Sequence, residues 1–320
     1  MERPAFVVTQ EALITTHPPR TRIVVTGANG SVGKNLLAHA TESADFDVVA
    51  VVRSERAAAA LPARTGVEVR VVAADDVDEL ARTMAGASSL VHLSGILIEN
   101  RTASYEQANV AATATAVEAC RRAAVPHIVL ISALGADVRT SNRYRRSKGE
   151  GEGVVERSKL DATIIRTPIL LGPETAGAAG LVRSVTGGKV SLLGGGRYMM
   201  RPLDVNDLSE AILSACRRHL AGVHVHELVG PEPISYRDLI ERVAGMMGRS
   251  VSYSVVPIWV AKVGAAINSR MKGGGVTPTV IDVITTSEAV THNADGELGV
   301  TLTPLSKTLD TIVTSWRRTT

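Results

Sequence analysis

Short runs of Val, Ile and Leu alternate with Ala-rich stretches from residue 22 to about residue 171. Continuous apolar runs of this kind are typical of strands that are buried on both faces. The pattern predicts strands at residues 23–26, 47–52, 67–72, 90–93, 127–132 and 163–166, and helices at residues 33–40, 77–84 and 105–124. Alternating strands and helices form a parallel sheet with helices on both sides. The sequence therefore predicts an α/β fold with a Rossmann-type doubly wound parallel sheet.

After residue 171 glycines occur in clusters, and the apolar runs alternate less regularly with Ala-rich stretches. Here the pattern predicts helices at residues 207–218, 236–247 and 256–267, a strand at residues 223–228, and an otherwise irregular C-terminal portion. We interpret the chain as an N-terminal extension, a Rossmann domain and a small C-terminal lobe on the substrate side, partly interleaved with that domain. The expected boundaries are residues 1–20, 21–171 and 172–320.

A glycine-rich loop follows the first predicted strand and has the pattern G-x-x-G-x-x-G. Gly27 permits the tight turn, Gly30 lets the backbone approach a pyrophosphate, and Gly33 allows the helix to pack closely on the strand. The first N–H groups of that helix then face the phosphates. Between an apolar strand and an amphipathic helix, the motif predicts a dinucleotide site that includes Gly27, Asn29, Gly30, Ser31, Val32 and Gly33.

The end of the second predicted strand indicates which dinucleotide is preferred. A site selective for NAD usually places Asp or Glu there to bind the ribose 2′-hydroxyl. Arg53 stands at that position with Ser54 beside it. A guanidinium suits a 2′-phosphate, so the sequence favours NADP(H) and leaves NAD(H) as an alternative.

The ends of the next two strands carry further candidate contacts. Asp75 and Asp76 follow the third strand, where a carboxylate can accept from the adenine amino group. Leu93, Ser94 and Gly95 follow the fourth strand, where small residues let the chain pass beside a cofactor. Ligands of parallel sheets bind at the carboxyl ends of the strands, so we expect these residues to lie together.

The motifs TGANGSVG (26–33), VVRS (51–54), VHLSG (91–95), IVLISALGAD (128–137), YRRSKGEGE (144–152), TIIRTPILLGPE (163–174) and RPLDVNDLSEAI (201–212) occur in this order. Together they resemble the extended or atypical branch of the short-chain dehydrogenase/reductase superfamily, which is similar to NAD-dependent epimerases and dehydratases. Within it they look most like the NADPH-binding proteins related to the 39-kDa accessory subunit of respiratory complex I. The resemblance implies further cofactor contacts at Ile131, Ser132, Thr167 and Pro168.

Tyr144 and Lys148 have the spacing Y-x-x-x-K, which puts both on one helix face. The resemblance implies that Tyr144 is the general acid/base for carbonyl–alcohol interconversion. It also implies that Lys148 lowers the pKa of the tyrosine and binds the nicotinamide ribose. Ser141 or Asn142 is expected to cap this helix. The alternative is a chance pair in a charge-rich helix.

A third catalytic hydroxyl is missing where the resemblance places it, since Leu134 occupies the position. Thr140 or Ser141 could substitute. The loop from Leu134 to Tyr144 is shorter than in sugar-nucleotide epimerases. The favoured hypothesis is therefore an oxidoreductase that transfers hydride between NADP(H) and a small carbonyl or alcohol. The first alternative is a non-catalytic NADP(H)-binding structural or sensing protein, and the second is a sugar-nucleotide epimerase or dehydratase.

Composition restricts the partners. The 35 basic and 32 acidic residues are interspersed and only 3% of residues are aromatic, so we expect no nucleic-acid partner. Two distant cysteines do not form a disulfide framework or a metal-ligand pattern. His224 and His226 share a strand face without a third ligand, so we expect packing and no metal, and we expect His92 to be a core residue.

No apolar run reaches the roughly 18 residues of a membrane span, so no integral membrane segment is expected. Residues 1–20 lack the long apolar core of a signal peptide, which predicts a cytoplasmic protein. The apolar stretch at residues 257–267 could line the substrate pocket, contact a partner or meet a membrane surface. A homo-oligomer is left open.

Overall fold

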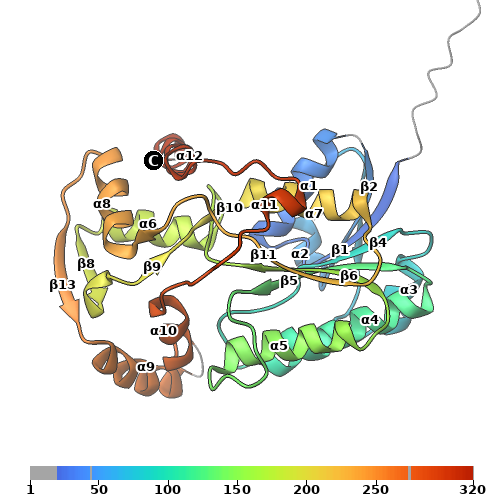
Figure 1. Ribbon diagram of the computed structural model, residues 1–320, viewed down its shortest axis with the longest axis horizontal. Coiled ribbons are helices and arrows are strands. Elements are labelled where there is room, and N and C mark those ends of the chain that lie inside the picture. The colour runs from blue at the N-terminus through green and yellow to red at the C-terminus, as the bar shows by residue number, and fades with distance from the viewer. Residues whose placement is uncertain (1–19, 44, 273–274, 320) are drawn as a thin grey trace, which may run out of the picture.

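A sheet of seven parallel strands forms the centre of the computed structural model, which describes residues 20–43, 45–272 and 275–319 (Figure 1). Across the sheet the strands are β11 (Val223–Glu227), β6 (Asp161–Thr167), β5 (His127–Ala133), β4 (Ser89–His92), β1 (Thr21–Thr26), β2 (Phe46–Val52) and β3 (Val67–Val71). This arrangement confirms the predicted Rossmann-type fold. Residues 1–19 of the predicted extension lie outside the described residues.

Helices cover both faces of the sheet (Figure 1). One face carries α1 (Ser31–Ser43), α7 (Val205–Arg218) and α11 (Asp295–Leu298), and the other carries α3 (Val77–Thr83), α4 (Ala112–Arg122) and α5 (Arg143–Glu156). Successive residues of β1 point to opposite faces of the sheet. Val25 packs with α1 and α7 on one face, whereas Val24 packs with α3 and α4 on the other. Both are fully buried, which is why these strands are apolar without alternation.

Two local features differ from the sequence prediction. The edge strand β3 has no buried residue, because no further strand and few side chains cover it beyond the short helix α2 (Glu55–Ala59). The helix predicted at residues 105–124 begins with a π-helical turn, Glu106–Ala111, before the regular helix α4. Such turns are frequent at functional sites, and this one presents Asn109 to the loop after β4.

The C-terminal half builds a third hydrophobic cluster from α6 (Ala176–Thr186), α8 (Tyr236–Met246), α12 (Leu305–Thr319) and β8 (Lys189–Leu193). Short strands join it: β7 (Leu170–Leu171), β9 (Met199–Met200), β10 (Leu203–Asp204), β12 (Ile234–Ser235) and β13 (Ser252–Val256). The prediction of an irregular C-terminal portion is wrong. It contains α9 (Ile258–Lys272), α10 (Pro278–Thr285), α11 and α12. In α12 the buried residues Leu305, Leu309 and Ile312 recur at helical spacing, a signal that the prediction missed.

The second half of the chain also returns to the main sheet. Strand β11 pairs in parallel with β6, and α7 packs against α1. The cap of α7 is Asp204, which accepts from the amide of Asn206 at 2.8 Å. Asp207 accepts from the amide of Thr303 at 2.8 Å and so holds the segment before α12.

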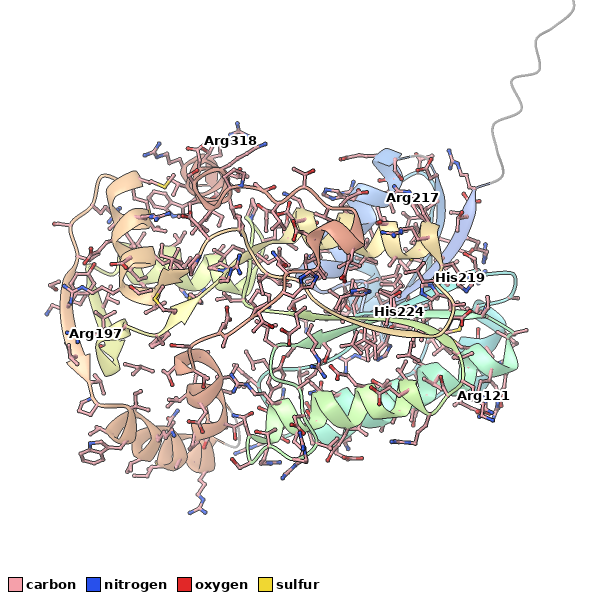
Figure 2. The ribbon with its side chains drawn as sticks, in the orientation of Figure 1. Arg121, Arg197, Arg217, His219, His224 and Arg318 are labelled. Carbon is pink, nitrogen blue, oxygen red and sulfur yellow. The ribbon has the colours of Figure 1, made fainter. Side chains whose placement is uncertain are left out.

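Arginines lie at separate parts of the surface, as Arg121, Arg197, Arg217 and Arg318 show in Figure 2. No helix among the described residues is long and apolar enough to cross a bilayer. In the same part of the chain no group of three or more His, Cys, Asp or Glu side chains is placed to hold a metal ion. His226 contacts Glu297 at 2.9 Å.

A buried ion pair ties α5 to the sheet. The Arg166 guanidinium donates to both carboxylate oxygens of Glu152, at 3.0 and 2.6 Å, and Glu152 is only 3% exposed. A bidentate pair of this kind fixes geometry as well as charge. It therefore positions the helix that carries Tyr144 and Lys148.

We expect Glu152→Ala to lower the free energy of unfolding by about 3–5 kcal/mol, because it leaves the partly buried Arg166 charge without its main partner. The matched control is Glu150→Ala on the same helix, where the carboxylate lies 4.0 Å from Arg146 at the surface. That change should cost less than about 1 kcal/mol. Urea denaturation followed by circular dichroism measures both, and equal losses would contradict the assignment.

Candidate functional site

The loop between β1 and α1 needs glycine at two positions where backbones nearly touch. Gly27 has a φ of +72°, and a Cβ there would lie 2.9 Å from the carbonyl carbon of Leu93. A Cβ on Gly33 would lie 2.5 Å from the carbonyl oxygen of Ala28. Both distances are shorter than van der Waals contact allows. The glycines thus let α1 begin directly at the sheet edge, with no acidic residue in its first turn to repel an anion.

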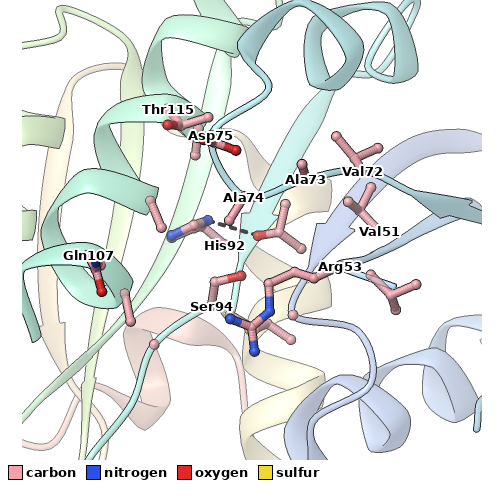
Figure 3. Close-up of a pocket in the computed structure, with 18 of the residues that line it drawn as sticks. Val51, Arg53, Val72, Ala73, Ala74, Asp75, His92, Ser94, Gln107 and Thr115 are labelled. Carbon is pink, nitrogen blue, oxygen red and sulfur yellow. Dashed lines mark hydrogen bonds between the residues drawn. The ribbon is translucent and has the colours of Figure 1, made fainter. Parts of the chain in front are cut away.

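A cleft of about 550 Å³ opens in front of this loop, at the carboxyl ends of β1, β2, β3 and β4 (Figure 3). Its volume is within the usual range for small-molecule and cofactor sites. The sequence-predicted residues that line it are Gly27, Asn29, Gly30, Arg53, Asp75, Leu93, Ser94 and Gly95. The structure therefore brings together residues from four loops that are distant in sequence.

Other predicted contacts lie beside the cleft. Ser31 and Val32 belong to the first turn of α1, with Gly33 behind the loop. Ser54 and Asp76 cap helices, because Ser54 accepts from the amide of Ala57 at 3.3 Å and Asp76 accepts from that of Glu79 at 2.9 Å. Their side chains thus have local structural partners, which the sequence reasoning did not anticipate.

The Arg53 side chain enters the cleft from the end of β2 (Figure 3). Within the described part of the chain no carboxylate forms a salt bridge with its guanidinium. An exposed guanidinium without a carboxylate partner can bind an anion such as a phosphate. Asp75 lies in the same cleft and supplies carboxylate acceptors.

His92 belongs to the cleft as well as to the core. Its Nδ1 lies 2.8 Å from the Thr26 hydroxyl, and the residue is 2% exposed. Its Nε2 is buried without a hydrogen-bond partner among the described residues, although the side chain lines the cleft. Burial lowers the pKa of His92 to about 3, with the Lys148 charge acting in the same direction, so the ring is neutral. The expectation of a fully satisfied core histidine holds for one ring nitrogen only.

Several residues that line the cleft were not predicted from the sequence, among them Ile96, Gln107 and Thr115. Gln107 and Thr115 lie two helical turns apart with Ala111 between them. Residues four apart lie on one face of a helix, so Gln107, Ala111 and Thr115 line the cleft together. That spacing was a usable signal, whereas Ile96 stands in a loop without any pattern.

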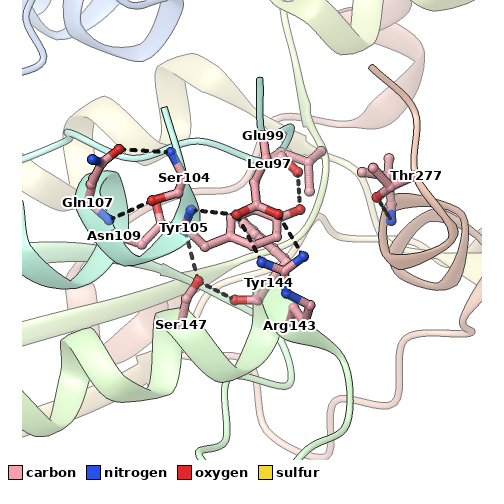
Figure 4. Close-up of polar contacts among 11 residues, drawn as sticks. Leu97, Glu99, Ser104, Tyr105, Gln107, Asn109, Arg143, Tyr144, Ser147 and Thr277 are labelled. Atoms are coloured by element: carbon pink, nitrogen blue, oxygen red, sulfur yellow. Dashed lines mark hydrogen bonds and ion pairs between the residues drawn. The ribbon is translucent and has the colours of Figure 1, made fainter. Parts of the chain in front are cut away.

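Asn109, in the π-helical turn, connects the loop after β4 to α5 (Figure 4). Its Oδ1 accepts from the amide of Ile96 at 2.8 Å, and its Nδ2 donates to the Ser147 hydroxyl at 2.9 Å. Ser147 in turn donates to the carbonyl of Tyr144 at 2.8 Å. The network fixes the first turns of α5 relative to the cleft.

Lys148 reaches from α5 to the end of β5, where its Nζ donates to the carbonyl of Ile131 at 2.7 Å. A Cβ on Gly95 would lie 3.7 Å from the same Nζ. The ammonium group therefore stands between the ends of β4 and β5, next to the cleft. Burial lowers the pKa of Lys148 to about 8, although Glu152 opposes the shift.

Tyr144 lies one turn before Lys148, and its helix is capped by Asn142, one of the two residues expected there. Its ring packs against Tyr105 with centroids 5.9 Å apart (Figure 4). Burial raises the pKa of Tyr144 to about 12, and Tyr105 adds to the shift. The expected lowering by Lys148 is not seen, because desolvation dominates and Lys148 is not among the causes of the shift.

The ends of β5 and β6 carry the other predicted contacts. The Thr167 hydroxyl donates to the carbonyl of Ser132 at 3.4 Å, and Pro168 follows directly. The Ser132 hydroxyl is buried and has no hydrogen-bond partner among the described residues. Thr140, a possible substitute for the hydroxyl missing at Leu134, accepts from the amide of Asn142 at 3.3 Å.

These features fit a dinucleotide. The close backbone contacts at Gly27 and Gly33 bring the start of α1 to the cleft, and Arg53 and the start of α1 both favour an anion. The unpartnered His92 Nε2 offers a polar contact inside the cleft. Gly27, Gly30 and the α1 amides would hold a pyrophosphate, with Arg53 and Asp75 at the adenosine end and Lys148 at the nicotinamide end.

Comparison with known proteins agrees with this fit. A family model described as NAD(P)H-binding matches residues 27–192. A curated relative from Arabidopsis thaliana, NADH dehydrogenase [ubiquinone] 1 alpha subcomplex subunit 9, is 29% identical over 194 residues, which is 60% of this chain and 48% of that protein. The chain thus spans about half the length of that relative. A ceramide reductase from Caulobacter vibrioides is 25% identical over 71% of this chain and 70% of its own length.

Solved structures share the fold over nearly the whole chain. MoeE5, in complex with UDP-glucose and NAD, superposes with a TM-score of 0.73 and 20% identity, covering 93% of this chain and 99% of MoeE5. A UDP-glucose 4-epimerase from Thermotoga maritima gives a TM-score of 0.71 at 17% identity, with 93% and 99% covered. The chain therefore belongs to the NAD(P)H-binding family, among the extended short-chain dehydrogenase/reductase-like proteins.

Proposed function

We propose that the protein is an oxidoreductase that transfers hydride between NADP(H) and a small carbonyl or alcohol. The observation that carries the proposal is the position of Lys148, whose Nζ stands between the ends of β4 and β5 on the same helix face as Tyr144. We assign cofactor binding to residues 21–171, substrate recognition to residues 172–320, and the protein to the cytoplasm.

The proposed roles follow from the protonation states. Bound NADPH would supply the hydride. Tyr144, whose pKa is raised to about 12, keeps its proton at neutral pH and donates it to the carbonyl oxygen as negative charge develops there. Lys148 binds the ribose hydroxyls and orients the ring. A tyrosine that holds its proton favours reduction of a carbonyl over oxidation of an alcohol.

A second candidate is a protein that binds NADP(H) without turnover. Leu134 favours it, because an apolar side chain stands where the family has the hydroxyl that polarises the substrate carbonyl. The relative named as a complex I subunit is consistent with this alternative. A sugar-nucleotide epimerase or dehydratase ranks third, since the loop between Leu134 and Tyr144 is short.

Arg53→Ala should weaken NADPH binding by about tenfold to a hundredfold, because it removes the charged partner of the 2′-phosphate, and should leave NADH binding nearly unchanged. Fluorescence titration of the reduced cofactors measures both. Arg56→Ala, one turn further along the chain, is the matched control and should change neither affinity. An equal loss of both cofactors would overturn the preference for NADP(H).

Affinity for NADPH should fall as the pH rises through about 8, the pKa of Lys148, because the ammonium that binds the ribose loses its proton. His92 is already neutral there, and Tyr144 ionises only near 12. Lys148→Met should bind weakly near neutral pH and show no such fall. A wild-type affinity that stays constant across this range would show that the ammonium is not needed.

Tyr144→Phe should lower kcat by about a hundredfold to ten-thousandfold without changing NADPH affinity, because it removes the proton donor and keeps the ring. A screen of carbonyl substrates, followed by absorbance of the reduced nicotinamide, finds the activity. Tyr105→Phe is the control, since its hydroxyl donates to the carbonyl of Leu97 and not to a substrate. Full activity in Tyr144→Phe would remove the proposed role; NADP(H) that survives dialysis without any turnover would favour the second candidate.

A further inference from the structure

Helix α9 (Ile258–Lys272) is a surface helix that buries little of its own apolar surface against the rest of the protein. It lies at the periphery of the C-terminal half, with α10 (Pro278–Thr285) as its neighbour (Figure 1). None of residues 258–271 is buried. A surface helix normally turns its apolar stripe toward a core, so a helix without one buried residue has an unused face.

That face is apolar and points to solvent. Trp259, Val263, Ile267 and Met271 recur every four residues, which places them along one side of the helix. They are 70%, 54%, 58% and 77% exposed. Exposed contiguous apolar surface on a folded protein marks a place where another molecule binds.

The charged residues of the helix itself all have one sign. Helix α9 contains Lys262, Arg270 and Lys272 and no Asp or Glu. Lys262 forms an ion pair with Asp282 of α10 at 2.5 Å. Arg270 is exposed, one helical turn from Ile267, and has no acidic partner among the described residues. Arg270 therefore adds an unpaired positive charge beside the apolar stripe.

We propose that α9 binds the surface of an anionic lipid bilayer, with its apolar stripe in the headgroup region and Arg270 among the lipid phosphates. An apolar face with an exposed Trp, on a helix whose charged residues are all basic, is typical of helices that lie in the plane of a membrane interface. The helix is too short to cross a bilayer. This inference goes beyond the proposed oxidoreductase activity and does not depend on it.

A second copy of the chain is a less suitable occupant. A two-fold dimer places the same patch of both subunits in contact, so two copies of a helix that has basic and no acidic residues would face each other. Anionic lipid supplies the complementary charge, and each basic residue near such a surface adds to the attraction.

Co-sedimentation of the full chain with vesicles tests the proposal. We expect at least about tenfold stronger binding to phosphatidylcholine vesicles that contain about one third phosphatidylglycerol than to phosphatidylcholine alone. Ile267→Ser with Met271→Ser should lower binding by about tenfold or more, since both side chains would leave the bilayer. Val69→Ser with Val225→Ser, at exposed apolar positions on β3 and β11, is the matched control and should bind normally.

Fluorescence gives a readout at α9 itself. The chain has two tryptophans, so Trp316→Phe leaves Trp259 as the sole reporter. Its emission should shift to shorter wavelength on addition of anionic vesicles, and Arg270→Glu should weaken the shift. Melting temperatures confirm that the variants are folded. No sedimentation, binding that the Ile267 and Met271 changes leave intact, or a dimer in solution that those changes dissociate would each overturn the proposal.

Discussion

The close approach of backbones at Gly27 and Gly33 is the constraint on which the site depends. Gly27 lets the loop pass against the chain leaving β4, and Gly33 brings α1 onto Ala28. A methyl group at either position would push the helix away from the sheet. The ends of β2, β3 and β4 could then no longer face the start of α1 across one cleft. The absence of a side chain at Gly27 and Gly33 thus allows Arg53, Asp75 and Ser94 to line one cleft.

Burial shifts the pKa values of Tyr144 and Lys148, the two proposed catalytic groups, in opposite directions, and in both cases it favours the neutral form. It raises the pKa of Tyr144 and lowers that of Lys148, so each is driven toward its neutral form. The inner end of the site is therefore poorly hydrated, and charge that develops on a substrate there interacts strongly with whatever polar groups are fixed nearby. The Asn109–Ser147 network and the Glu152–Arg166 pair hold those groups in place.

The sequence predicted the sheet well because its strands are apolar on both faces, and it predicted the cleft because parallel strands end at one edge. It did not predict features that depend on neighbours distant in the chain. Asp204 caps α7 through one carboxylate oxygen, while Thr308 of α12 donates to the other at 2.6 Å. No residue pattern distinguishes the π-helical turn around Asn109 from an α-helix. The exposure of α9 depends on which other elements pack against it, and the sequence of the helix does not contain that information.

The return of β11 to the main sheet has a consequence for synthesis of the chain. Until residues 223–227 have left the ribosome, β6 is an outer strand whose peptide groups on one side have no pairing partner. Open edges of this kind template unwanted pairing with other chains. The sheet of the Rossmann half is thus incomplete when β6 emerges from the ribosome. About sixty further residues must follow before β11 can pair with this edge of β6. Slow translation across that interval would expose the nascent protein to aggregation.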